Sequence, residues 1–350
     1  MALMPDLLSA GLIEKDSHGD ITWTWAYPSV TPFLRDFYIR KSNLNSESVP
    51  VPFTYGQFQR IWYYISTTDV ADTDNLPKVK KFSLVLTAKD FNPEKYESLT
   101  RIMCALYKET GTPVSILETF LTVMTKGVCR SEENGTFTTR DFSTSDAYFA
   151  GSAKDLINTF GVESILIYVA MLLKKRVVVY HPNVGELIQA ARAFPALVWE
   201  RQNWNLLYPN VHLDKDEMSD LQSNTSYVAG FTEASVEGRS DLYDIFVNLN
   251  NAEISIAPQA KETFAMGKLH KDIAMYMVQS AEDDSMSNKD VIGAVVKKTK
   301  ELLNNLKSLA TEGEDGKASI SIEALRGRNM PPAMENFLYN LAAAEGLVQL

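Results

Sequence analysis

The segment 175–182, Lys-Arg-Val-Val-Val-Tyr-His-Pro, constrains the fold of this chain more than any other part of the sequence. Its β-branched residues favour an extended conformation. No polar residue alternates with the valines, which is typical of a strand that is buried on both faces of a sheet. An apolar helical stretch precedes it, and three further apolar segments follow at residues 194–199, 226–231 and 242–249. Helical and strand-like segments therefore alternate, and this order predicts an α/β fold class.

Length and composition limit the classes of protein to which the chain can belong. With 350 residues, of which 45% are hydrophobic and 22% are charged, the chain can bury a sizeable core and divide into two or three lobes. The formal net charge is −10, so the chain lacks the overall positive charge that nucleic-acid binding requires. The same net charge argues against a general attraction to anionic lipid, although it does not exclude local basic patches. We expect a globular protein that binds no nucleic acid.

Cysteine usage and hydropathy predict a cytoplasmic location. The chain has two cysteines, Cys104 and Cys129, too few for a disulfide framework. Its first residues lack the basic stretch and the apolar core of a secretion signal. The longest apolar run, residues 165–173, is much shorter than the ~20 residues that a membrane-spanning helix needs. We expect reduced thiols and no membrane span.

Residues 1–127 alternate strand-like and helical segments and predict a small α+β lobe. Asn92 followed by Pro93 marks the start of one helix, because asparagine caps helices well and proline suits the first turn. Elsewhere β-propensity indicates strands, and the spacing of apolar residues indicates helices. The expected strands cover residues 7–15, 20–27, 58–68 and 81–87, and the other expected helices cover residues 30–41 and 114–125.

The rest of the chain divides into a polar segment and two further lobes. Residues 128–151 are rich in polar and turn-forming residues, and we interpret them as a linker or lid. Ser152 is a suitable N-cap for a helix over residues 153–173, with which the second lobe, residues 152–257, begins. The third lobe, residues 258–350, is expected to be almost entirely helical, because its apolar residues recur at helical spacing.

A search for catalytic motifs finds no candidate active site. The sequence has no phosphate-binding loop, no dinucleotide-binding glycine motif, no metalloprotease motif and no nucleophile elbow. Its four histidines are scattered, and no two have helical ligand spacing. Cys104 is predicted to be a core thiol, whereas Cys129, near the polar segment, could be exposed. We predict no bond-breaking catalytic residue, no cofactor and no metal.

Two polar clusters leave alternatives open. Trp199 and Trp204 bracket a charged turn, and they are either core aromatic residues or anchors of a protein interface. The basic run 174–176 either caps the C-terminus of a helix, where cations offset the helix dipole, or forms a lipid-binding patch. Because the run follows an apolar helix directly, we favour the cap.

The order of these segments resembles the DENN-domain family, and within it most closely the small stand-alone DENN domain-containing protein ten subfamily. The resemblance covers the whole chain and implies a tripartite fold: a longin-like lobe at 1–127, a central α/β lobe at 152–257 and a helical lobe at 258–350. The segments that carry it are residues 11–16, 84–96, 131–135, 227–231, 265–271 and 332–339.

The resemblance also implies a function. Members of this family bind Rab GTPases in the GDP-bound or nucleotide-free form, and many act as guanine-nucleotide exchange factors. The subfamily is associated with late endosomes and with the Commander endosomal-recycling assembly. We therefore expect a cytoplasmic protein that partners recruit to the endosomal membrane, with the GTPase between the longin-like and central lobes. Our candidate partner-binding residues are Trp199, Arg201, Trp204 and Tyr227.

One departure from the family keeps other functions open. Larger DENN proteins approach the central glycine through a Pro-x-Pro-Tyr-like segment, whereas residues 224–230 of this chain read Asn-Thr-Ser-Tyr-Val-Ala-Gly. Binding without exchange is therefore an alternative, as a non-catalytic adaptor that docks on the coiled-coil subunits of Commander. A further alternative is a GTPase-activating protein that uses Arg130 or Arg140 as an arginine finger.

Overall fold

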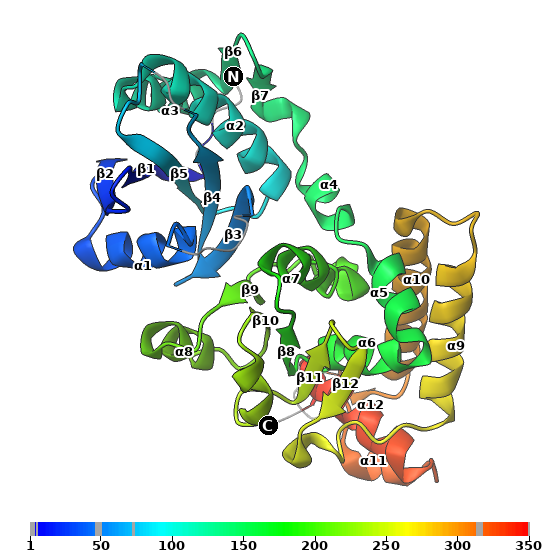
Figure 1. Ribbon diagram of the computed structural model, residues 1–350. Helices are drawn as coiled ribbons and strands as arrows, with labels where there is room; N and C mark the ends of the chain where they lie inside the picture. Colours follow the sequence, from blue (N-terminus) through cyan, green and yellow to red (C-terminus); the bar gives the residue numbers. More distant parts are fainter. Residues whose placement is uncertain (1–3, 5, 46–50, 72–73, 313–317, 349–350) are drawn as a thin grey trace. The chain divides into compact units, whose positions relative to one another are not determined.

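The structure is a computed structural model that describes Met4 and residues 6–45, 51–71, 74–312 and 318–348. The chain forms two compact units, Met1–Ala147 and Tyr148–Leu350. We call them the N-terminal and the C-terminal unit. Each unit combines a five-stranded sheet with helices, so the predicted α/β (α+β) class is confirmed (Figure 1).

The sheet of the N-terminal unit is antiparallel, with strand order β2-β1-β5-β4-β3. We expected one strand over residues 58–68, but the structure has two strands joined by a tight turn. Gln59 and Arg60 both adopt positive φ, of 50° and 62°, as a two-residue hairpin turn requires. The strands are β1 (Leu7–Asp16), β2 (Ile21–Tyr27), β3 (Phe53–Phe58), β4 (Ile61–Asp69) and β5 (Val79–Ala88).

Helices cover both faces of this sheet (Figure 1). Alternate residues of a strand point to opposite faces, so β4 contributes to two cores. Tyr63 lies in a buried cluster with Phe37 of α1, whereas its neighbour Tyr64 stacks on Tyr96 of α2 with ring centroids 4.3 Å apart. The predicted N-cap Asn92 is confirmed, since its side chain accepts a hydrogen bond from Lys95 N. The helices are α1 (Pro32–Ser42), α2 (Pro93–Thr110) and α3 (Pro113–Lys126).

Residues 128–147, which we interpreted as part of a linker, contain a short hairpin that belongs to the N-terminal unit. Its strands are β6 (Val128–Ser131) and β7 (Gly135–Thr138), and α4 (Thr144–Phe149) follows. The side chains of Cys129 and Phe137 are buried, and the Phe137 ring stacks on Phe142 at 5.5 Å. The turn-forming residues 131–135 are therefore the loop of a packed hairpin.

The sheet of the C-terminal unit has the order β12-β11-β8-β10-β9, and all its strands except β12 run parallel. The valine-rich segment 175–182 contains its central strand, and Val177, Val178 and Val179 are fully buried as predicted. In β10, a Cβ atom at Gly230 would lie 2.4 Å from the carbonyl oxygen of Pro209, so only glycine allows the two strands to pair here. The strands are β8 (Arg176–Tyr180), β9 (Leu207–Val211), β10 (Tyr227–Phe231), β11 (Ile245–Asn248) and β12 (Glu253–Ile256).

The helix that we expected over residues 153–173 is broken in two, α5 (Ala153–Phe160) and α6 (Ser164–Leu172). Gly161 lies between them with φ of 53° and ψ of −132°, a conformation that ends α5. The stretch Thr144–Leu172 is long and apolar enough to span a membrane by length and composition alone. However, 61% of its most apolar window is buried inside the protein, as in the core helix of a globular domain.

The last third of the chain is mainly helical, as predicted, and packs against α5, α6 and the segment Pro195–Arg201. Polar contacts join it to the end of α4 and the start of α5. Asn288 Nδ2 donates to the carbonyl oxygens of Phe149 (2.8 Å) and Gly151 (3.1 Å), and Lys154 Nζ donates to that of Met286 (2.8 Å). The remaining helices of this unit are α7 (Val184–Ala191), α8 (Lys215–Gln222), α9 (Lys268–Glu282), α10 (Asn288–Lys307), α11 (Ile322–Arg326) and α12 (Pro332–Ala344), and a two-residue pair, β13 (Thr311–Glu312) and β14 (Ala318–Ser319), follows α10.

Candidate functional site

The parallel strands β8, β9, β10 and β11 end at the same edge of their sheet, and ligands of open α/β sheets bind at this carboxyl edge. The chain leaves these strands at His181, His212, Thr232 and Leu249. We therefore take the carboxyl edge, defined by the loops after these strands, as the candidate functional site.

A pocket of about 280 Å³ opens at the ends of β8 and β11. Asp155 and Glu186 contribute carboxylates to its wall, from α5 and α7, and His181 lies beside them. The loop after β8 is held by Asn183, whose side-chain oxygen accepts from Gly185 N at 2.8 Å and so caps α7. The pocket therefore presents two acidic groups on rigid elements, which suits a basic partner surface.

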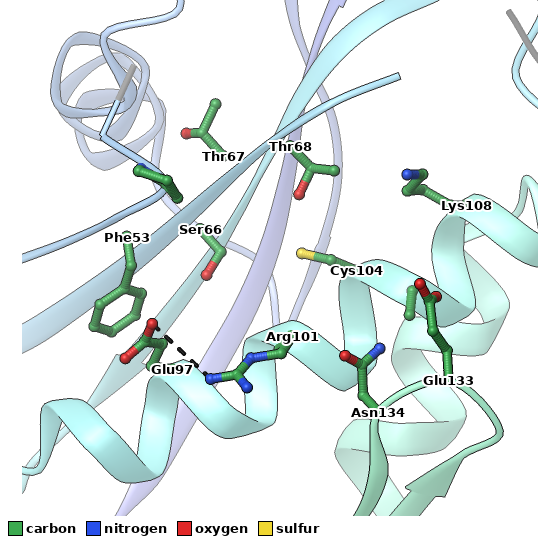
Figure 2. A pocket seen from close by; sticks show the side chains of 12 residues that line it. Phe53, Ser66, Thr67, Thr68, Glu97, Arg101, Cys104, Lys108, Glu133 and Asn134 are labelled. Carbon is green, nitrogen blue, oxygen red and sulfur yellow. Dashed lines mark ion pairs between the residues drawn. The ribbon is translucent and has the colours of Figure 1, made fainter. Parts of the chain in front are cut away.

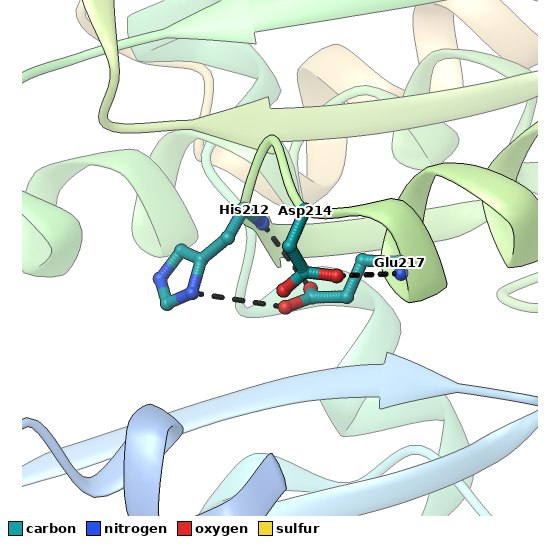
Figure 3. A group of neighbouring side chains, drawn as sticks. All are labelled: His212, Asp214 and Glu217. Atoms are coloured by element: carbon teal, nitrogen blue, oxygen red, sulfur yellow. Dashed lines mark hydrogen bonds and ion pairs between the residues drawn. The ribbon is translucent and has the colours of Figure 1, made fainter.

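His212, Asp214 and Glu217 gather after β9, with ligand atoms within 4.8 Å of one another (Figure 3). Such a set of imidazole and carboxylate groups is chemically able to hold a divalent cation. Each carboxylate also accepts a backbone hydrogen bond: Asp214 Oδ1 from Glu217 N at 2.9 Å, and Glu217 Oε2 from His212 N at 3.2 Å. Asp214 therefore serves as the N-cap of α8, and Glu217 ties the turn before this helix to its first turn.

The structure brings Arg201 and Tyr227, two of the four predicted partner-binding residues, to one small cavity of about 50 Å³. Arg201 donates from Nη1 to the carbonyl oxygen of Met171 (2.8 Å) and from Nη2 to that of Leu172 (2.9 Å), and it pairs with Glu345 after α12. Arg201 is thus the cation that caps the C-terminus of α6. From the sequence we expected the basic run 174–176 to cap this helix. A capping role for Arg201 could not be expected, because Arg201 is close to the helix only in the folded chain.

Lys174 and Arg176 have other partners. Lys174 adopts φ of 52° and ends α6 through its backbone, and its side chain donates to the carbonyl oxygen of Ala344. Arg176 Nη2 pairs with Asp244 Oδ1 at 3.0 Å, which ties the start of β8 to the segment before β11.

The three aromatic residues among the four predicted partner-binding residues contact other parts of the protein. Trp199 stacks on Phe149 with ring centroids 5.2 Å apart, and Trp204 stacks on Tyr148 at 4.8 Å. Tyr227 is buried in β10, its hydroxyl donates to a backbone carbonyl, and burial raises its pKa to about 12. These contacts favour the core interpretation of the two tryptophans, and partner binding by the four residues stays a prediction.

A separate pocket of about 250 Å³ lies in the N-terminal unit, between β4, α2 and the loop of the β6–β7 hairpin (Figure 2). Cys104 points from α2 toward the sheet, and burial raises its pKa to about 12, so the predicted core thiol is confirmed (Figure 2). Cys129, which we considered a candidate for exposure, is buried as well, and burial raises its pKa to about 12. Both thiols are therefore protonated near neutral pH and are poor nucleophiles.

Comparison with known proteins agrees with this architecture. Residues 151–258, which contain the whole parallel sheet, match the family model described as "SPA: Stabilization of polarity axis". DENN domain-containing protein 10 of Homo sapiens is 49% identical over 346 residues, which cover 98% of this chain and 97% of that protein. The protein of the same name from Danio rerio is 48% identical over 351 residues, which cover all of both chains. That from Dictyostelium discoideum is 39% identical over 355 residues, which cover 97% of each chain. The chain therefore belongs to the DENN domain-containing protein 10 family.

Proposed function

We propose that this protein regulates Rab GTPases as a guanine-nucleotide exchange factor in late-endosomal trafficking, and that partners recruit it from the cytoplasm to the endosomal membrane. The observation that carries the proposal is the similarity to DENN-domain proteins over nearly the whole chain. Two buried, protonated thiols are consistent with a mechanism that forms no covalent intermediate.

Nucleotide exchange requires only that the exchange factor bind the nucleotide-free conformation of the GTPase more tightly than the nucleotide-bound one. A GTPase that holds its nucleotide with a Kd between nanomolar and picomolar binds it with about −12 to −16 kcal/mol. An exchange factor must therefore stabilise the nucleotide-free conformation by a comparable amount, since a protein that binds both conformations equally shifts nothing. The carboxyl edge, with Asp155 and Glu186 on rigid helices, is the surface that we assign to this contact.

The test is release of a fluorescent GDP analogue from a panel of purified Rab GTPases with and without this protein. We expect faster release from at least one Rab. The double variant Asp155→Asn, Glu186→Gln should reduce the rate about two- to five-fold, as expected for exposed charge pairs. Glu253→Gln, an exposed change on β12, is the matched control and should leave the rate unchanged. Unchanged GDP release from every Rab at micromolar protein would exclude exchange activity.

A non-catalytic adaptor is the second candidate function, in which the protein docks on coiled-coil subunits of the Commander assembly. The observation that favours it is the outward face of α3, where Val114 and Leu121 are 55% and 41% exposed. Exposed apolar residues seven positions apart fit the repeat of a helical partner. A pull-down from cytosol should then recover a coiled-coil assembly independently of nucleotide, and recovery of Rab GTPases only after nucleotide removal would contradict it.

A GTPase-activating function is the third candidate. Arg130 and Arg140 are both exposed, as an arginine finger requires. Such a residue accelerates hydrolysis by ~10³ or more. Arg130→Ala and Arg140→Ala should then be compared with the wild type in single-turnover GTP hydrolysis. An intrinsic rate unchanged by the wild-type protein, for Rabs that it binds, would exclude this function.

A further inference from the structure

Two turns at the carboxyl edge share one pattern of polar residues. The turn after β8 covers residues 181–186 and the turn after β9 covers residues 212–217, and we call them the β8 turn and the β9 turn. In each turn a histidine precedes the residue that caps the next helix, and a glutamate follows in the first turn of that helix. These residues are His181, Asn183 and Glu186 in the β8 turn and His212, Asp214 and Glu217 in the β9 turn. The cap is a neutral asparagine in the first case and an acidic aspartate in the second.

In the β8 turn the histidine contacts the backbone of its own turn. The backbone N–H of Asn183 donates a hydrogen bond to Nδ1 of His181 at 3.1 Å. Glu186 is exposed to solvent. The β8 turn therefore has one carboxylate, and a backbone hydrogen bond orients its imidazole.

In the β9 turn the histidine faces the glutamate instead (Figure 3). Nδ1 of His212 is 3.7 Å from Oε1 of Glu217, and the side chain of Glu217 is only 4% exposed. Asp214 adds a second carboxylate, and the ligand atoms of the three residues all lie within 4.8 Å of one another. The β9 turn therefore gathers an imidazole and two carboxylates at one place.

The separation of 3.7 Å distinguishes two interpretations of this cluster. A protonated imidazole that donates to a carboxylate lies about 2.7–2.9 Å from it, and 3.7 Å is beyond hydrogen-bond length. Two ligand atoms of a tetrahedral zinc site, each about 2.0–2.1 Å from the metal, are about 3.4 Å apart. The observed separation is thus nearer to that of two zinc ligands than to that of a hydrogen bond.

Charge and backbone hydrogen bonds favour a cation at the same place. Two carboxylates so close together repel each other, and a divalent cation between them offsets the repulsion. Glu217 N donates to Asp214 Oδ1 at 2.9 Å, and His212 N donates to Glu217 Oε2 at 3.2 Å. A carboxylate can accept such a hydrogen bond on one oxygen and coordinate a metal with the other. Outer-shell hydrogen bonds of this kind orient the ligands of metal sites.

We propose that His212, Asp214 and Glu217 bind one zinc ion, with water in the fourth coordination position. Imidazole and carboxylate ligands suit zinc, whereas calcium and magnesium prefer sites made of oxygen ligands alone. We expected no metal from the sequence because no two histidines have ligand spacing, and a site with a single histidine escapes that criterion. The inference goes beyond the proposed function and does not depend on it.

Zinc titration of the untagged full-length protein by isothermal titration calorimetry, after a chelator has removed bound metal, tests this proposal. We expect one zinc ion to bind per chain. Zinc should also raise the temperature of thermal unfolding, because an ion that binds the folded state stabilises it. Magnesium and calcium at the same concentration should bind more weakly.

Two ligand variants and a matched control locate the ion. Asp214→Asn removes a charged ligand and retains a good helix cap, as Asn183 shows at α7. It should weaken zinc binding by more than about ten-fold, since loss of an outer-shell partner alone costs about 10–100-fold. His212→Ala removes the imidazole, keeps the backbone N–H that donates to Glu217, and should have the same effect. His181→Ala, in the β8 turn, is the control and should bind zinc like the wild type.

Any of four results would overturn the proposal. One is that the wild type does not bind zinc in a one-to-one ratio. Another is that Asp214→Asn and His212→Ala both keep the wild-type affinity for zinc. A third is that His181→Ala weakens binding as much as these two variants do, which would place the ion elsewhere. The fourth is that magnesium or calcium binds as tightly as zinc, which would exclude a site selective for zinc.

Discussion

At the scale of single residues, Arg201 shows how a side chain with the character of an interface residue serves the fold. Its guanidinium joins the end of α6 to Glu345, and its side chain is 19% exposed. Arg201→Ala removes the guanidinium and leaves buried carbonyl groups and a carboxylate without this donor. The variant should therefore lower the free energy of unfolding by about 2–3 kcal/mol. Arg239→Ala removes an exposed ion pair with Asp241 and should change the free energy of unfolding by less than about 1 kcal/mol. Urea unfolding measures both, and equal effects of the two variants would contradict a structural role for Arg201.

At the scale of elements, the break between α5 and α6 depends on the backbone of one glycine. Gly161 has φ of 53°, and no atom lies within 4 Å of a Cβ built there, so only backbone strain would oppose alanine. Gly161→Ala should therefore destabilise the protein by about 1–3 kcal/mol. Gly293, inside α10, has equal space and no positive φ, so Gly293→Ala should stabilise it by about 0.5–1 kcal/mol. Thermal unfolding of the two variants gives the sign of each change in stability. A stabilising effect of Gly161→Ala would show that the break between α5 and α6 does not require glycine.

At the scale of the whole molecule, the helical last third and the parallel sheet form one compact unit, while Met1–Ala147 forms another. Asn288 of α10 donates to the last residue of α4, and Lys154 of α5 donates to the loop before α10, at 2.8 Å in each case. We therefore expect amide protons of α9, α10 and β8 to lose protection together in hydrogen exchange at increasing urea, because they belong to one cooperative unit. Asn288→Ala should lower the protection of all three elements, whereas Asn305→Ala, exposed on α10, should not. Loss of protection in α9 and α10 at lower urea than in β8 would show that the helical part unfolds by itself.

Much of the fold follows from patterns that are local in the sequence. The valines of β8 predicted a doubly buried strand, and Asn92 with Pro93 predicted the start of α2, because strand burial and helix capping depend on residues a few positions apart. The resemblance in lobe order identified the family, which the comparisons confirm. The same local logic placed Cys104 in the core.

The tertiary structure decided what depends on contacts between distant residues. Arg201 and Glu345 are 144 positions apart, so no local pattern could assign the guanidinium to the end of α6. Residues 128–147 look polar, yet Cys129 and Phe137 are buried because the helices α2 and α3 pack beside the hairpin. Likewise, Asp155 and Glu186 share a pocket only because the parallel strands end at one edge. Local sequence determines which elements form, whereas the packing of those elements determines which side chains meet.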